Sequence, residues 1–159
     1  TICTGVRESK NELIFMLDAD LIGMRSEDVT ALLEPVINNV ADVSISLRRN
    51  APGVFRMIDL DYISGERVLP KSILADNLEK ITSLPKFGLE SFINKVIIKN
   101  KYRVKIVHWN TVDSPYQNVK RSYWNGIKGE ILKVVDIFKT IGIFGPIIQI
   151  IKMSRLKVK

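Results

Sequence analysis

The sequence predicts an α/β fold, in which an open sheet carries helices on both faces and a basic helical tail follows. Leu13 to Leu17 form a continuous apolar run, which is typical of a strand buried on both faces. Residues 41–47 alternate between apolar and polar side chains, as a strand with one buried face does. The intervening segment 29–37 repeats its apolar residues at helical spacing. With 159 residues, 46% of them hydrophobic, the chain can form one ordinary core plus an appendage.

The other elements follow in chain order. Residues 26–39 read as a helix capped by Ser26, because a serine hydroxyl can satisfy a free amide of the first turn. We expect a second helix over 64–78 and a third over 89–99. Residues 102–109 alternate as a strand, with His108 on its apolar face, where a lone histidine is more often a core residue than a ligand.

Charge divides the chain into residues 1–118 and a tail over 119–159. The first part holds 15 basic and 15 acidic side chains, whereas the tail holds nine basic and two acidic ones and so supplies the net charge of +7. The apolar run 141–151 is too short to span a bilayer and suits a helix in the membrane interface, or one docked on the domain. Few aromatic residues interrupt this tail, which argues against nucleic acid as a partner. The lone Cys3 excludes an intrachain disulfide and fits a reducing compartment.

Acidic and basic pairs follow several of these elements. Asp18 and Asp20 come directly after the apolar run, and two carboxylates at the end of a strand suit a divalent metal and the diphosphate that it bridges. An acidic turn is the alternative. The adjacent Arg48 and Arg49 either hold a phosphate or point into solvent. The segment 59–61, Asp-Leu-Asp, follows no apolar run and is interpreted as a solvated or capping pair.

The segment Asp18-Ala19-Asp20 resembles the D-x-D motif of nucleotide-sugar glycosyltransferases with the GT-A fold, especially glycosyltransferase family 2. Residues 63–69 resemble the S-G-x-R segment of this family, and residues 87–90 its G-x-E segment. The resemblance covers roughly residues 5–129 and implies the later portion of a GT-A, Rossmann-like sheet. Family members carry about three strands ahead of the D-x-D motif, so we expect the chain to be the carboxyl-terminal part of a larger enzyme and catalytically silent alone.

The resemblance implies roles for the matching residues. Asp20 would bind Mg²⁺ or Mn²⁺ directly, and Asp18 would bind it through water or hold the donor ribose. Ser64, Gly65 and Glu66 would face the acceptor side, with Arg67 near the donor phosphate. Glu90 would orient or deprotonate the acceptor. Many relatives have Glu-Asp where this chain has Glu90-Ser91, so the acceptor could instead be one that needs no base, such as a lipid phosphate.

Two further positions complete the implied site. Some family members use a histidine after the last strand as a third metal ligand, and here the candidates are Asp113, which fits the alignment, and His108, which has the expected side chain. Lys120 and Arg121 match lysines that relatives place against the donor diphosphate or a lipid phosphate.

The predicted function is metal-dependent transfer of a sugar from a nucleotide-diphosphate sugar to a sugar, small-molecule or lipid-phosphate acceptor. We expect this hexosyltransferase-like chemistry in the cytoplasm, with peripheral contact at the inner face of the membrane as an option for the tail. The alternative is a catalytically inactive fragment that acts as a membrane-tethered or protein-interaction module.

Overall fold

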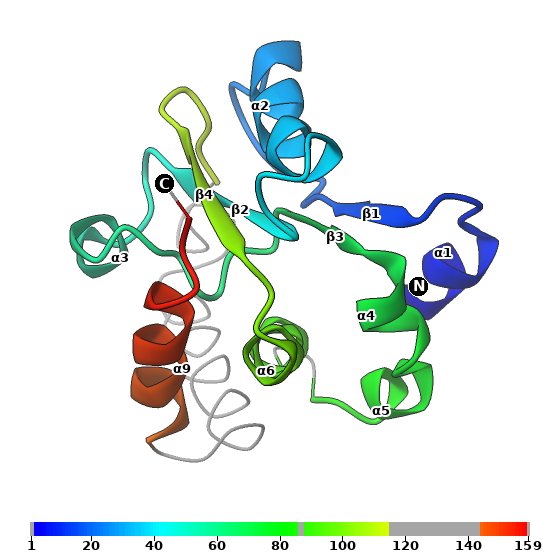
Figure 1. Cartoon of the computed structure of the whole chain (residues 1–159). Coiled ribbons are helices and arrows are strands. Elements are labelled where there is room, and N and C mark those ends of the chain that lie inside the picture. The colour runs from blue at the N-terminus through cyan, green and yellow to red at the C-terminus, as the bar shows by residue number, and fades with distance from the viewer. Residues whose placement is uncertain (1, 86–87, 115–143, 159) are drawn as a thin grey trace, which may run out of the picture.

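A computed structural model describes residues 2–85, 88–114 and 144–158 of the chain. Its sheet has the strand order β1-β3-β2-β4 (Figure 1). The strands are β1 (Leu13–Met16), β2 (Val43–Arg48), β3 (Arg67–Pro70) and β4 (Val104–Trp109). β3 runs antiparallel to both of its neighbours, while β2 and β4 are parallel.

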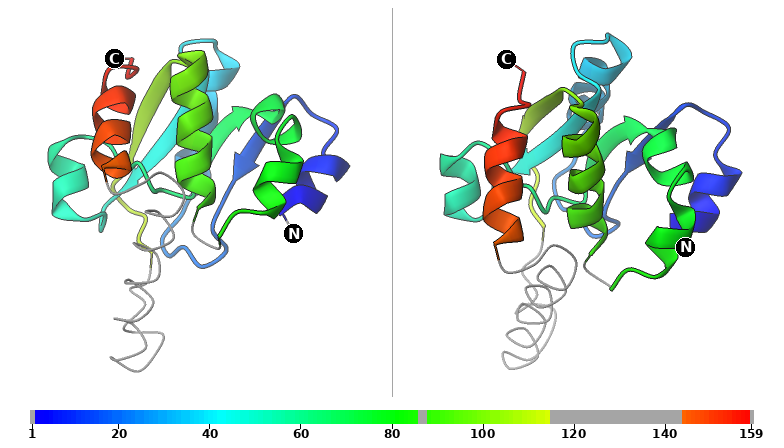
Figure 2. Two further views of the ribbon diagram at one scale, coloured as in Figure 1. Left: turned by 90° about the horizontal axis from the view of Figure 1, so that it is seen from below. Right: turned by 60° about the horizontal axis from the view of Figure 1, so that its bottom comes forward.

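Helices cover both faces of this sheet (Figure 2). They are α1 (Ile2–Glu8), α2 (Ser26–Ile37), α3 (Gly53–Met57), α4 (Lys71–Ala75), α5 (Leu78–Thr82), α6 (Leu89–Asn100) and α9 (Gly145–Ser154). On one face, Leu32 of α2 packs in a cluster with Trp109. On the other face, Ile93 of α6 and Met153 of α9 pack in a cluster with Ile45. The expected α/β fold with helices on both faces is therefore confirmed.

The two strands with the clearest sequence patterns, β1 and β2, are buried in the reverse of the predicted way. β1 pairs only with β3 among the described strands, and its four apolar residues are half-buried. β2 lies inside the sheet and is buried on both faces, although every second residue is polar. Its two serines are accepted there because each is hydrogen-bonded: the hydroxyl of Ser44 donates to the carbonyl of Leu32, and that of Ser46 to Glu66.

Two boundaries also differ from the sequence prediction. The predicted helix over 64–78 is wrong for its first half, because Val68 is paired on both sides, with Phe15 of β1 and Ser44 of β2, and so lies in a strand. Within the second half, α4 is helical as predicted. α2 begins at Ser26, with Arg25 as its N-cap residue, whose amide donates to the carboxylate of Asp28. The predicted helix over 89–99 is confirmed as α6.

The described part of the basic tail docks on the domain. α9 lies beside α6 (Figure 1) and buries Gln149 and Met153. The chain then reaches the sheet, where Lys157 forms a parallel bridge with Val104. Residues 115–143, with Lys120 and Arg121, lie outside the described residues. None of the described helices is long and apolar enough to cross a bilayer.

Candidate functional site

The turn after β1 meets the loop before β3. The antiparallel register places Met16 opposite Arg67, so the residues that follow one strand lie beside those that precede the other. A Cβ atom added to Gly65 would lie 3.0 and 3.1 Å from the carboxylate oxygens of Asp18. The D-x-D segment and the Ser-Gly-Glu-Arg segment are thus in contact, and the absence of a side chain at Gly65 makes room for the Asp18 carboxylate.

Acidic side chains from three segments influence one another at this point. Asp18 is solvent-exposed as a residue, but its carboxyl group is partly desolvated where it lies against Gly65. This desolvation, followed by the negative charges of Glu66, Asp20 and Glu90, raises the pKa of Asp18, while the positive charge of Arg48 lowers it. We refer to Asp18, Asp20, Glu66 and Glu90 as the acidic cluster. A divalent cation at this cluster would relieve the repulsion.

Glu66 forms the buried part of the acidic cluster. Its side chain is fully enclosed, and its Oε2 atom accepts hydrogen bonds from the hydroxyls of Ser64 (2.7 Å) and Ser46 (2.9 Å). The guanidinium of Arg48 donates to Oε1 over 3.3 Å. Ser64 and Glu66 were predicted to face the acceptor, but the structure places both beneath the surface, where Glu66 acts on Asp18 through its charge.

Arg48 balances the acidic residues beneath the site. It pairs with Asp61 (3.5 Å) as well as with Glu66, and Asp61 is only 1% exposed. Burial raises the pKa of Asp61, while Arg48 and Arg67 lower it. Residues 59–61 were interpreted as a solvated or capping pair. For Asp61 the solvated alternative is wrong, while its Oδ1 atom does accept from the amide of Ile63 over 3.3 Å. Sequence reasoning missed this pair, although the position of Arg48 at the end of a strand was a signal for it.

Arg67 lies inside the fold rather than at the surface. Its Nε atom donates to the carbonyl of Ser64 (2.6 Å), Nη1 donates to Oδ1 of Asn94 (2.6 Å) and Nη2 donates to the carbonyl of Tyr62 (2.8 Å). The sequence predicted that Arg67 would lie near the donor phosphate. In the structure, all three guanidinium nitrogens instead donate to oxygens of the protein. Arg67 instead fixes the loop that presents Gly65 and joins it to α6.

Glu90 lies in the first turn of α6, as the sequence indicated, and is half-buried. Its charge acts on both Asp18 and Arg67, so it lies close enough to influence both side chains. The three segments that resemble the family motifs therefore converge on one place.

The structure distinguishes the two candidates for a third metal ligand. The backbone of Asp113 pairs with that of Ile22 through two hydrogen bonds of 2.9 and 3.0 Å, so the segment after β4 lies beside the loop that follows Asp20. Its carboxylate forms a bidentate ion pair with Arg49, which lowers the pKa of Asp113.

His108 takes part in a different group of side chains. It is exposed, which contradicts its interpretation as a core histidine, and its Nε2 atom lies 2.6 Å from Oδ1 of Asp59. The other oxygen of Asp59 accepts from Lys157 over 3.1 Å. Of the two candidates, only Asp113 is paired with the D-x-D loop.

The described residues contain no group of three or more histidine, cysteine, aspartate or glutamate side chains arranged to hold a metal. Mg²⁺ is usually held in proteins by one or two carboxylates together with substrate phosphates and water. Asp18 and Asp20 are exposed carboxylates of that kind, and the repulsion around Asp18 favours a cation. The residues present therefore fit Mg²⁺ or Mn²⁺ bound together with a diphosphate.

Comparison with known proteins identifies the fold. No family model matches the chain, and no curated protein is similar to it in sequence. Solved structures of glucosyl-3-phosphoglycerate synthase from Mycobacterium tuberculosis are similar in fold. The complex with Mn²⁺, UDP-glucose and phosphoglyceric acid aligns with a TM-score of 0.60 at 15% identity, over 87% of this chain and 52% of that one. The complex with Mn²⁺, UDP and glucosyl-3-phosphoglycerate aligns with a TM-score of 0.62 at 16% identity, over 89% and 54%.

These similarities have a defined extent. The chain spans about half the length of the synthase. At 15–16% identity, TM-scores of 0.60 and 0.62 show a shared fold. The chain therefore has the α/β fold of GT-A-type glycosyltransferases.

Proposed function

We propose that the chain carries the metal-binding and acceptor-facing part of a nucleotide-sugar glycosyltransferase. The observation that supports this most directly is the position of Asp18 over Gly65, where partial desolvation, and then the negative charges of the acidic cluster, raise the pKa of its carboxyl group. The fold is shared with a synthase whose crystals hold Mn²⁺ and UDP-glucose, which supports the same class of donor here.

Each part of the site has a role in this proposal. Asp18 and Asp20 hold Mg²⁺ or Mn²⁺, which when bound neutralises the diphosphate leaving group. Asp113 can supply a third oxygen if Arg49 moves away from it, because its backbone is fixed beside the D-x-D loop. Lys120 and Arg121, outside the described residues, remain candidates for contact with phosphate.

Glu90 is the candidate group for the acceptor. A carboxylate in the first turn of a helix, half-buried and facing the metal-binding acids, can hydrogen-bond an acceptor hydroxyl and either orient it or accept its proton. The synthase with the shared fold binds phosphoglyceric acid, a phosphate-bearing molecule. We propose an acceptor that also carries phosphate, either a small molecule or a lipid.

The test measures binding, because the chain spans only about half of the synthase. Calorimetry with UDP-glucose and Mn²⁺ should show metal-dependent binding that Asp20→Ala abolishes, since loss of one ligand and one charge costs several kcal/mol. Glu34→Ala, which removes an acid that lines the outer surface of α2, is the matched control and should bind normally. Equal affinity for Asp20→Ala and the parent would contradict the proposal.

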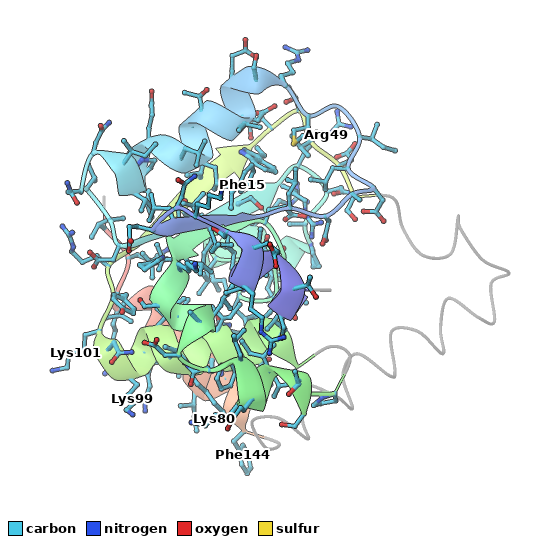
Figure 3. All side chains as sticks on the ribbon, turned by 90° about the vertical axis from the view of Figure 1, so that its right-hand side faces the viewer. Phe15, Arg49, Lys80, Lys99, Lys101 and Phe144 are labelled. Atoms are coloured by element: carbon cyan, nitrogen blue, oxygen red, sulfur yellow. The ribbon has the colours of Figure 1, made fainter. Side chains whose placement is uncertain are left out.

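A second proposal concerns the tail and rests on the outer surface of α9. Phe144, Ile147, Ile148 and Ile151 recur at the spacing of one helix face, and Phe144 is 73% exposed. Phe144 projects away from the body of the protein, and Lys80, Lys99 and Lys101 lie towards the same side (Figure 3). We propose that this face contacts an anionic membrane surface, because apolar side chains accompanied by lysines suit the interface.

Liposome sedimentation tests this contact. Ile147→Asp with Ile151→Asp should strongly weaken binding to vesicles that contain anionic lipid, although both changes leave every lysine in place. Both side chains are exposed, so the fold should be unaffected. Added salt should weaken the parent only in part, because the apolar contribution is not screened. Equal binding by the double variant and the parent would contradict the proposal.

A further inference from the structure

α9 is oriented with its amide side chain inward and several isoleucines outward. Gln149 is 4% exposed, whereas Ile147, Ile148 and Ile151 are between 48% and 58% exposed. Burying an amide in place of an isoleucine sacrifices hydrophobic stabilisation and is tolerated only where the amide is hydrogen-bonded. The orientation of α9 therefore depends on the partners of Gln149.

Those partners lie on α6. The Nε2 atom of Gln149 donates to the carbonyl of Ser91 over 2.7 Å, and its Oε1 atom accepts from Nδ2 of Asn94 over 3.4 Å. Asn94 also donates to the carbonyl of Tyr62 (2.6 Å) and accepts from Arg67 (2.6 Å). A chain of buried hydrogen bonds thus runs from α9 through α6 to the loop that presents Gly65.

The contact at Ser91 has a direct consequence for the site. Ser91 follows Glu90 in the first turn of α6, where a helix has the fewest internal hydrogen bonds. A buried amide bound to this turn restricts its movement. We propose that Gln149 is a positioning residue, which fixes the first turn of α6 so that Glu90 faces Asp18 and Asp20. This inference deepens the proposed function and rests on it.

Hydrogen exchange tests the positioning without any ligand. Gln149→Leu removes both hydrogen bonds, and exchange of the amides of Phe92 to Lys95 should become about tenfold faster, the change that about 1.4 kcal/mol produces. Met153→Leu alters the same buried face of α9 without a polar contact and should leave these amides unchanged. If the leucine variant fails to fold, Gln149→Glu takes its place in the experiment. This variant keeps an acceptor for Asn94 but loses the donor to Ser91, so it should also accelerate exchange of these amides.

A paramagnetic measurement adds a readout that a purely structural role would not change. With Mn²⁺ and UDP-glucose bound, the amide of Glu90 should be broadened in the parent and less broadened in Gln149→Leu, while that of Ala19 is broadened equally in both. Equal broadening of Glu90 in the two proteins, or exchange rates that match those of Met153→Leu, would overturn the inference. Absence of broadening anywhere in the parent would instead contradict the proposed function, and the exchange rates would then decide the role of Gln149 alone.

Discussion

Replacing Gly65 with alanine should separate the stability of the fold from the affinity of the site. The new Cβ atom would lie 3.0 and 3.1 Å from the two carboxylate oxygens of Asp18 and 3.2 Å from its Cγ. The neighbour must therefore give way by a few tenths of an ångström. Asp18 can do so, since the atoms in contact are the end of an exposed side chain rather than backbone.

Two opposing effects on stability should nearly cancel. Alanine reduces the freedom of the unfolded chain, which stabilises a protein by about 0.4–1 kcal/mol where the native backbone suits it. Gly65 does not have the positive φ that would strain an alanine. Moving Asp18 away from its preferred rotamer costs about 0.5–1.5 kcal/mol. We expect the free energy of unfolding to change by less than about 1 kcal/mol, or roughly 4 °C in Tm.

Metal affinity should change far more. Mg²⁺ and similar ions demand near-ideal positions of their ligand oxygens, and disturbing the groups that support a ligand typically weakens metal binding by about 10–100-fold. The assay is calorimetry of UDP-glucose with Mn²⁺, beside thermal unfolding. Gly53→Ala is the control, because its added Cβ meets nothing within 4 Å. If Gly65→Ala bound UDP-glucose and Mn²⁺ with the parental affinity, Asp18 would have no role in metal binding at this position. If the variant were unfolded, Asp18 could not move aside as proposed.

Three further predictions address individual residues. Arg67→Lys loses at least two buried hydrogen bonds and should destabilise the fold by about 3 kcal/mol, lowering Tm by roughly 6–12 °C; parental stability would contradict the buried network. The pKa of Asp18 is raised, so its ionised form destabilises the fold above that pKa, and this cost is relieved as the pH falls through it. Asp18→Asn should therefore be more stable than the metal-free parent at pH 7, by up to about 1 kcal/mol. It should lose this advantage below the ordinary pKa of 3.8. Urea unfolding at both pH values checks this, and an unchanged difference would refute it. Asp113→Asn should lower Mn²⁺ affinity whereas His108→Asn should not, and the reverse result in the same titration would make His108 the third ligand.

Local patterns were sufficient for the parts of the fold whose environment follows from their own residues. The helical spacing over 89–99 predicted α6 and placed Glu90 in its first turn. The acids after the apolar run predicted two carboxylates just beyond the end of β1. In both cases the structure that the segment favours by itself is the one that it adopts in the fold, so the periodicity and position of its residues were enough to predict it.

Other parts depend on pairing between distant segments. Apolar character alone would make β1 the interior strand, yet β2 is more deeply buried because Ser44 and Ser46 find partners in α2 and in Glu66. Val68 lies in a strand because it pairs with two neighbours, which its own segment does not reveal.

The same limit applies to the site. The positions of Asp18 after β1 and of Glu90 in the first turn of α6 could be predicted. The burial of Arg67 and the pair formed by Arg48 and Asp61 could not. A buried arginine and an exposed one have the same local sequence signature, and only the surrounding oxygens distinguish them.

We propose that the D-x-D segment, Gly65 and Glu90 surround one metal-dependent nucleotide site. The most direct measurement is paramagnetic broadening of backbone amide signals when Mn²⁺ is added with UDP-glucose. We expect the amide signals of Ala19, Gly65 and Glu90 to broaden first and that of Asn100, at the far end of α6, to stay sharp. Asp18→Asn should remove the effect. Broadening confined to acids elsewhere, such as Asp42 and Asp59, or equal broadening of all amides, would contradict this.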